Sequence, residues 1–314
     1  MKLNIRHRTY YDYAQTASLS NNQICLQPRD TRTQKCLSSR VEINPEPNSL
    51  HYQTDVFGNK VVQFDLNKQH NDCEIIVSSM VETTDIVADL PTSLQQKENL
   101  EGLTQLSSGE ALMAIECLLP SPYIQPEHVQ DSLIKEVPMS NQSVLEYAGE
   151  LMSHIFNTFE YQSGFSTLIT PLSEIYAARK GVCQDFAHLA ISVLRRQGIP
   201  ARYVSGYLET LPPPGQKKLQ GADASHAWFS VFDAVQGWYD FDPTNNKRPD
   251  RQYITTAWGR DYGDVAPVKG VVYGGGKHSL IVEVDVNRMG ECVSEKTEAS
   301  AYARPMEKLY EPKL

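Results

Sequence analysis

The first 82 residues alternate between apolar and polar side chains with a period of two. The alternation is clear at residues 37–44, 62–67 and 73–79. Because successive side chains of a strand point to opposite faces, this period predicts β-strands with one buried face. Gly58 and Asn59, between two strand-like runs, tolerate the positive φ angles of a tight hairpin turn. We therefore expect short antiparallel strands that form a β-sandwich.

The second half of the chain changes to a helical period. From Ser143, apolar residues recur every three or four positions, and the spacing of Ser143 and Glu146 has the form of a capping box. A short helix is predicted to open at Pro171 and to end near residue 179. A third helix is predicted from Cys183 to a stop at Gly198.

The region from about 83 to 140 contains five prolines and is interpreted as a connector with one short helix at residues 108–118. After the third helix, strand-like runs follow at residues 201–209, 226–232 and 238–241, with one more at 278–287. The proline-rich segment 211–224 is predicted to be a surface loop; a lid over a cleft is the weaker alternative.

The composition is that of a globular protein with ample length for a core. The chain has 314 residues, of which 40% are hydrophobic and 21% charged, and this length favours about two domains. The net charge of −9 and the lack of a basic cluster argue against nucleic acid or an anionic membrane as a partner. The polar N-terminus lacks the apolar run of a signal peptide, so a cytoplasmic location is predicted.

The six cysteines are widely separated and include no C-x-x-C pair. This pattern predicts free thiols rather than a disulfide scaffold or a zinc site, and we expect neither a metal nor a cofactor. The glycines at 274–276, followed by Lys277, match a phosphate-binding loop only in part, because Val271 and His278 stand where that loop needs Gly and Ser or Thr. We interpret them as a flexible turn.

Cys183 is the candidate nucleophile because it lies in the first turn of a predicted helix. The unpaired N–H groups and the dipole of a helix N-terminus favour a negatively charged thiolate, which is the reactive form. Gly181 just before it permits a tight turn and the close approach of a substrate backbone. The alternative, a small buried apolar cysteine, has about equal weight at this stage.

Two downstream strand ends supply the candidate base and its partner. His226 begins an apolar strand, where it can face a cleft beside Trp228, and Asp242 ends the next strand before Pro243. A nucleophile, a base and an orienting carboxylate can meet in this way. Taken singly, each residue is better explained as an ordinary surface or turn residue. Asp240, two residues earlier on the same strand face, is the alternative carboxylate.

Four segments of the chain carry a family resemblance. Residues 181–188, 198–207, 226–228 and 237–245 resemble, in order, the signature blocks of the bacterial transglutaminase-like superfamily, which includes cysteine proteases. Residues 1–82 resemble the β-rich N-terminal region of these proteins, and residues 259–267 resemble a segment beyond the core.

The resemblance implies an α+β fold. It consists of an N-terminal antiparallel β-sandwich followed by a papain-like transglutaminase core, in which helices pack on an antiparallel sheet. The expected boundaries are 1–110 for the sandwich with its connector, 111–289 for the core and 290–314 for a polar tail without predicted structure.

The resemblance also implies the roles of the site residues. Cys183 is the nucleophile, His226 the base and Asp242 the residue that orients the base. The backbone N–H of Cys183 is a natural donor to the oxyanion, and Tyr161 and Gln184 are weak candidates for a second donor. His188, about 140° around the helix from Cys183, is expected to point away from the thiol.

The expected activity is cysteine-dependent acyl transfer on a peptide or isopeptide amide, most readily hydrolysis by a protease or amidase. Cross-linking or deamidation is the alternative reaction, and an inactive binding or assembly module is the alternative from another class. An N-acyltransferase would need a preformed acyl donor, for which the sequence shows no binding feature. By family analogy no calcium requirement is expected.

Overall fold

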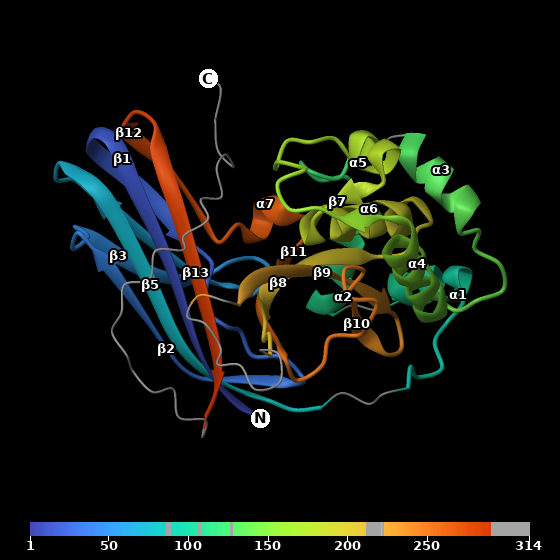
Figure 1. Ribbon diagram of the computed structural model, residues 1–314. Coiled ribbons are helices and arrows are strands. Elements are labelled where there is room, and N and C mark those ends of the chain that lie inside the picture. Colours follow the sequence, from blue (N-terminus) through green and yellow to red (C-terminus); the bar gives the residue numbers. More distant parts are fainter. Residues whose placement is uncertain (86–88, 106–107, 126–127, 212–220, 222, 290–314) are drawn as a thin grey trace.

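A computed structural model describes residues 1–85, 89–105, 108–125, 128–211, 221 and 223–289. Figure 1 shows two parts side by side, a tall array of strands and a compact part in which helices surround a smaller sheet. The predicted α+β class is confirmed: the N-terminal part is antiparallel, and the core has helices packed on an antiparallel sheet. The predicted loop 211–224 and the tail after 290 lie mostly or wholly outside the described residues.

The N-terminal part is organised around one long strand. Strand β1 (Lys2–Ile24) pairs through its first half with β5 (His70–Thr83) and through its last residues with β4 (Lys60–Leu66). Strands β2 (Gln34–Asn44) and β3 (Ser49–Thr54) extend the two halves outward. A single apolar cluster joins residues of β4 and β5, so the two halves of the sheet face each other as in a sandwich. The predicted Gly58-Asn59 hairpin joins β3 to β4, with Gly58 at φ 77°.

Two strands from the C-terminal part complete this sheet. Strands β12 (Val268–Gly274) and β13 (His278–Arg288) pair with β1 one after the other, antiparallel to it. Two strands of the predicted core segment 111–289 therefore pair within the N-terminal sheet. The predicted turn at Gly274–Gly276 joins β12 to β13. All three glycines have positive φ, and backbone hydrogen bonds tie the segment to a bend in β1.

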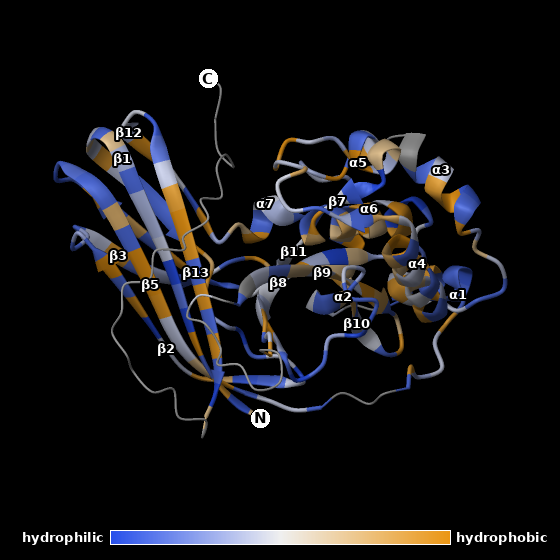
Figure 2. Ribbon diagram, viewed as in Figure 1, coloured by the Kyte–Doolittle hydropathy of each residue, from blue (hydrophilic) through white to orange (hydrophobic). Residues whose placement is uncertain are grey.

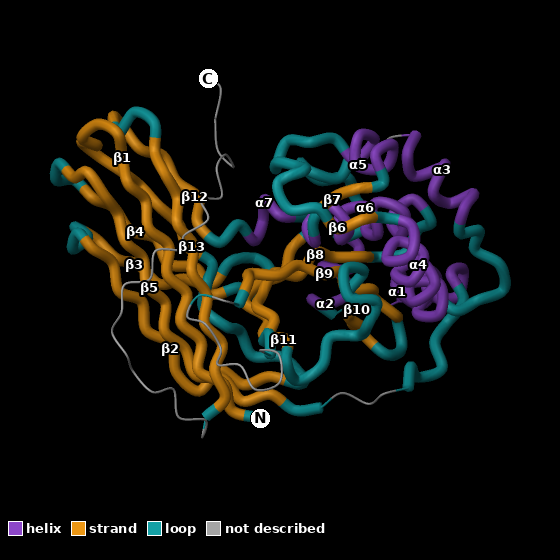
Figure 3. Tube along the Cα trace, viewed as in Figure 1, coloured by secondary structure: helices purple, strands orange, loops and turns teal. Residues whose placement is uncertain are grey.

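The second part has helices against a four-stranded sheet. Its strands are β8 (Ala201–Leu208), β9 (Ala224–Asp233), β10 (Gly237–Phe241) and β11 (Tyr253–Gly259), in the spatial order β10-β9-β8-β11. Helices α4 (Val144–Thr158) and α6 (Cys183–Arg196) pack on this sheet through the largest apolar cluster. Figure 2 shows the apolar residues gathered along these helices, and Figure 3 shows the helices confined to this part of the molecule.

The helices confirm most of the predicted periodicity. Ser143 caps α4 with the expected capping box, and α2 (Gly109–Glu116) matches the helix predicted in the connector. Helix α5 (Leu172–Ala178) follows Pro171, which is the N-cap rather than the first helical residue. The prediction missed α1 (Gln96–Gln105), α3 (His128–Glu136), α7 (Tyr262–Val265) and the short strands β6 (Glu160–Tyr161) and β7 (Lys180–Gly181). It also missed β11 and β12, whose sequences lack a clear alternation.

The two parts share a buried interface. An apolar cluster combines Leu3 and Val286 of the strand array with Tyr207 and Ile254 of the smaller sheet. Arg288 makes two hydrogen bonds to the buried carboxylate of Glu209, at 2.7 and 2.9 Å. Bidentate hydrogen bonds between a guanidinium and a carboxylate are strong and directional, so this pair fixes the strand array against the smaller sheet.

The described cysteines, which exclude only Cys292, are all free thiols. No group of three or more described His, Cys, Asp or Glu residues is placed to hold a metal ion. Among the described helices, none has the length and apolar character needed to cross a bilayer.

Candidate active site

Cys183 is the first residue of helix α6. The N-cap residue Val182 provides no side-chain hydrogen bond, so the N–H groups of the first turn remain available to an anion. Just before it, β7 pairs in parallel with β6, which brings Tyr161 next to Gly181. The thiol is half-buried against the main apolar cluster.

The carboxylate of Asp185 fixes the turn just before Cys183. It accepts hydrogen bonds from the backbone N–H of Val182 at 2.8 Å and from the hydroxyl of Ser166. Burial raises the pKa of Asp185. A Cβ atom at Gly181 would lie 2.9 Å from this carboxylate and 3.1 Å from the ring of Phe186. Gly181 is therefore required for packing behind the nucleophile.

His226 and Asp242 meet at the ends of two neighbouring strands. His226 lies near the start of β9, and Asp242 directly follows β10. The imidazole Nε2 is 2.7 Å from Oδ2 of Asp242. Cys183 lies near enough to His226 to raise the pKa of its imidazole. Since Nε2 is engaged with the carboxylate, Nδ1 is the nitrogen that remains for the thiol. The structure thus brings together the three residues predicted from the sequence.

The imidazole of His226 is held in its charged form. Burial disfavours the charge, but the interactions with Asp242 and Cys183 outweigh burial and raise the pKa of His226 to about 10. At neutral pH the imidazole ring is therefore charged. Trp228 lies beside the ring, with a centroid separation of 6.0 Å, and is fully buried.

Asp242 is fully buried and accepts hydrogen bonds from several groups besides His226. Tyr253 donates its hydroxyl to Oδ2 at 2.6 Å, and Asn245 donates its amide to the same oxygen at 2.7 Å. The backbone N–H of Thr244 donates to Oδ1 at 2.8 Å. Although burial opposes ionisation, these donors and His226 hold the pKa of Asp242 below its ordinary value.

Sequence reasoning missed Tyr253 and gave Asn245 no role. Asn245 lies within the last signature block, three residues after Asp242, so its position was a usable signal. Tyr253 lies in an unpredicted strand and had no local signal. Both residues orient the carboxylate that orients His226.

Asp240, the alternative carboxylate, has a different environment. Its charge acts on the guanidinium groups of Arg202 and Arg248. Arg202 lies between two indole rings, 4.0 Å from the Trp238 centroid and 3.7 Å from that of Trp258. Asp242 is therefore the better candidate for the orienting residue.

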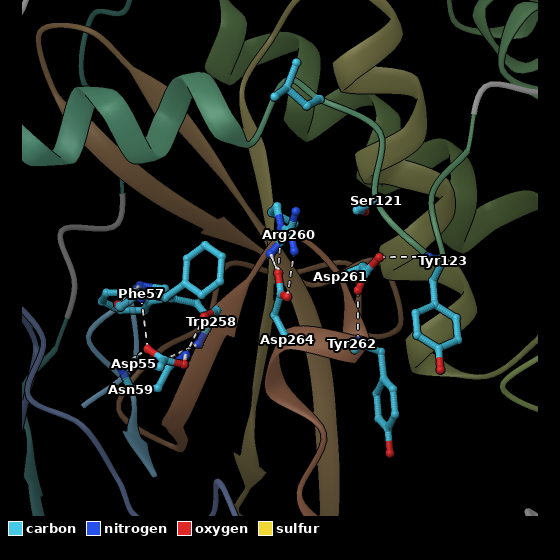
Figure 4. A network of polar contacts seen from close by, with 12 residues as sticks. Asp55, Phe57, Asn59, Ser121, Tyr123, Trp258, Arg260, Asp261, Tyr262 and Asp264 are labelled. Carbon is cyan, nitrogen blue, oxygen red and sulfur yellow. Dashed lines mark hydrogen bonds and ion pairs between the residues drawn. The ribbon is translucent and has the colours of Figure 1, made fainter. Parts of the chain in front are cut away.

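His188 lies within a cluster of tyrosine rings. It stacks on Tyr123 and approaches Tyr203, with centroid separations of 5.9 and 4.9 Å, and its Nε2 accepts the backbone N–H of Tyr262 at 3.2 Å. Figure 4 shows Tyr123 and Tyr262 near Asp261, whose buried carboxylate accepts the N–H of Tyr123 at 2.8 Å. Burial lowers the pKa of His188 to about 3, so the ring is neutral and structural.

Tyr161, one of the two candidates for a second oxyanion donor, lies near Cys183 and Asp185. Burial and the nearby Cys183 and Asp185 raise the pKa of its hydroxyl. The side chain nevertheless remains 55% exposed, so it borders the site from the solvent side. Gln184 follows Cys183 in the first turn of α6 and is half-buried.

Comparison with sequence families matches two regions of the chain. Residues 3–82 match the "Bacterial transglutaminase-like N-terminal region", and residues 131–243 match the "Transglutaminase-like superfamily". The second match contains Cys183, His226 and Asp242.

Individual relatives cover different shares of the chain. An uncharacterized protein of Mycobacterium tuberculosis is 36% identical over 290 residues, which span 90% of this chain and 91% of the relative. A protein-glutamine gamma-glutamyltransferase of Pseudomonas aeruginosa is 38% identical over 78 residues, which span 24% of this chain and 12% of that enzyme.

A solved structure covers nearly the whole fold. It is a Cytophaga hutchinsonii protein provisionally described as a cysteine protease, with a TM-score of 0.72 and 24% identity over 94% of this chain and 92% of that one. At this identity the similarity establishes the shared fold.

Proposed function

Because the chain belongs to the transglutaminase-like superfamily, we propose that it is a cysteine-dependent acyltransferase acting on a peptide or isopeptide amide, with hydrolysis as its main reaction. The observation that carries the proposal is the contact series Cys183–His226–Asp242, in which the imidazole is charged at neutral pH. In this proposal Cys183 attacks as the thiolate, with His226 as its proton partner.

The proposed reaction has two halves. The Cys183 thiolate attacks the carbonyl carbon of the amide, and the negative charge on the carbonyl oxygen is met by the Cys183 backbone N–H, with Tyr161 as the candidate second donor. The carbon–nitrogen bond then breaks, and His226 gives its proton to the departing amine or ammonia. A thioester with Cys183 remains.

In the second half, His226 takes a proton from the acceptor that attacks the thioester. Water as acceptor yields a carboxylic acid and releases Cys183 as the thiolate beside the protonated His226, which is proteolysis or deamidation. An amine as acceptor yields a new amide, which is cross-linking. The relationship to the glutamyltransferase of Pseudomonas aeruginosa over 78 residues supports cross-linking as the second candidate.

The test is the reactivity of each cysteine toward iodoacetamide, read by peptide mass spectrometry, followed by a screen of peptide, isopeptide and glutamine substrates with and without an added amine. We expect Cys183 to react fastest, His226→Ala to remove this advantage, and Cys183→Ala to abolish amide cleavage. An unexceptional Cys183 would instead support the inactive binding module. Peptide or protein substrates and a cytoplasmic location stay predictions.

A further inference from the structure

Among the residues that the structure describes, the strand that carries Tyr253 has a neighbouring strand on one side only. β11 pairs with β8 along one edge, and its other edge ends the four-stranded sheet. Backbone N–H and C=O groups along a buried edge need hydrogen-bond partners. Here the partners are side chains of the N-terminal strand array, together with the backbone N–H of Arg29, which donates to the carbonyl of Thr255 at 3.2 Å.

The first partner is the buried side chain of Gln34, at the start of β2. Its amide nitrogen donates to the carbonyl of Thr255 at 2.9 Å, and its amide oxygen accepts the N–H of Thr255 at 2.8 Å. A third hydrogen bond, 2.7 Å to the carbonyl of Arg29, fixes the amide itself. Gln34 therefore pairs with β11 as a residue of a neighbouring strand would.

Asn59 repeats this pairing farther along the strand. It donates to the carbonyl of Trp258 at 2.8 Å and accepts the N–H of the same residue at 2.9 Å. As Figure 4 shows, Asp55 holds Asn59 in place; its carboxylate accepts the backbone N–H of Asn59 at 2.8 Å and the side-chain amide at 2.8 Å. The guanidinium of Arg29 covers the Trp258 ring at 3.2 Å from its centroid.

A third contact lies before β11. The hydroxyl of Thr83, the last residue of β5, donates to the carbonyl of Arg251 at 2.8 Å. The strand array therefore contacts this edge at residues 251, 255 and 258. Tyr253 lies between the first two contact points, so its backbone is fixed from both sides.

Tyr253 transmits this constraint to the reaction site. Its hydroxyl donates to the Asp242 oxygen that is paired with His226. Its ring meets Trp228 edge to face at 5.3 Å and lies 6.0 Å from the His226 ring. A displacement of β11 would therefore move the groups that set the carboxylate against the imidazole. Displacements of about 1 Å at such sites cost roughly a hundredfold in rate.

We propose that the N-terminal strand array is part of the reaction site: Gln34 and Asn59 are positioning residues that fix β11 and, through Tyr253, hold Asp242 against His226. The inference rests on the proposed function and assigns a role to the N-terminal region within it. It also explains why polar side chains with paired donors and acceptors are buried at this interface.

The first experiment compares Gln34→Ala with Gln27→Ala. Gln27 is a matched control because it is also buried in the strand array but bonds to Ser39 of the same array and not to β11. We expect Gln34→Ala to reduce kcat and the alkylation rate of Cys183 about tenfold, with little change in KM, at temperatures where circular dichroism shows both variants folded. Gln27→Ala should retain wild-type values. Equal losses in both variants would overturn the proposal.

The second experiment tests the route through Tyr253. In a Tyr253→Phe background, Gln34→Ala should cause no further loss of Cys183 reactivity, because the link to Asp242 is already broken. Independent, additive losses would show that Gln34 acts in another way.

A spectroscopic readout separates this inference from the proposed function. The Nε2 proton of His226 in its hydrogen bond to Asp242 can be followed by NMR in selectively ¹⁵N-labelled protein without any turnover. We expect its signal to shift or broaden in Gln34→Ala and to persist in Gln27→Ala. An unchanged signal in both variants overturns the inference even if the enzyme is active. If wild-type Cys183 is unreactive, the proposed function fails, while this signal still decides the positioning role.

Discussion

Replacing Asp242 with asparagine removes the charge that faces His226 while it preserves the size of the side chain. The pKa of His226 rises from an ordinary 6.5 to about 10, a difference that corresponds to about 5 kcal/mol in favour of the charged imidazole. Asp242 and Cys183 both raise the pKa of His226, and together they outweigh the opposing effect of burial. If Asp242 supplies about two pKa units, its loss weakens the charged imidazole relative to the neutral one by roughly 3 kcal/mol, or about a hundredfold in that equilibrium constant.

The assay is the alkylation rate of Cys183 by iodoacetamide near pH 7, with Cys36 of the same molecule as an internal reference because it is partly exposed and lies in the N-terminal array. We expect Asp242→Asn to slow Cys183 by about 30-fold or more and to leave Cys36 unchanged. Turnover should fall further, by about 10³-fold or more, because the wrong imidazole tautomer also disables proton transfer.

Asp240→Asn is the matched control, since the same substitution two residues earlier changes a carboxylate that faces arginines instead of His226. It should leave Cys183 alkylation close to the wild-type rate. The reasoning is refuted if Asp242→Asn reacts like the wild type or if Asp240→Asn proves the damaging change.

Three further outcomes follow from the structure. His226 should stay charged up to about pH 9, because its pKa is raised to about 10. An NMR titration of its ring signals checks this, and a transition near pH 6.5 would contradict it. Burial lowers the pKa of His188 to about 3, so below pH 6.5 the unfolded chain binds a proton that the folded protein does not, and the free energy of unfolding decreases. His188→Gln should remove about 2 kcal/mol of this decrease at pH 5, as measured by urea unfolding. Gly206→Ala should destabilise the protein by at least about 1–3 kcal/mol, because the new Cβ would lie 2.0 Å from the carbonyl oxygen of Ile254. The melting temperature measures this loss, and an unchanged value would disprove the close contact.

Local patterns in the sequence were sufficient for the elements that carry the nucleophile. The 3.6-residue period and the stop at Gly198 predicted α6, and this placed Cys183 at a helix start without any tertiary information. The period of two and the Gly58-Asn59 step likewise predicted the β3–β4 hairpin. These signals are readable because they depend on residues only a few positions apart.

The choice between the two carboxylates needed the tertiary structure. Asp240 and Asp242 are two residues apart, so strand periodicity assigns them to the same face and cannot rank them. The fold decides, because it places Arg202 near Asp240 and places His226, Asn245 and Tyr253 around Asp242.

The same limit applies to the domain boundaries and to the N-terminal array. β13 pairs with β1 although Leu3 and Arg288 are far apart in the sequence, and Gln34 bonds to Thr255 across 221 positions. Short-range period and turn chemistry determined which elements form and where the thiol sits. Contacts between distant segments determined what holds the imidazole and its carboxylate, because a buried hydrogen bond depends on positions in space that leave no local pattern in the chain.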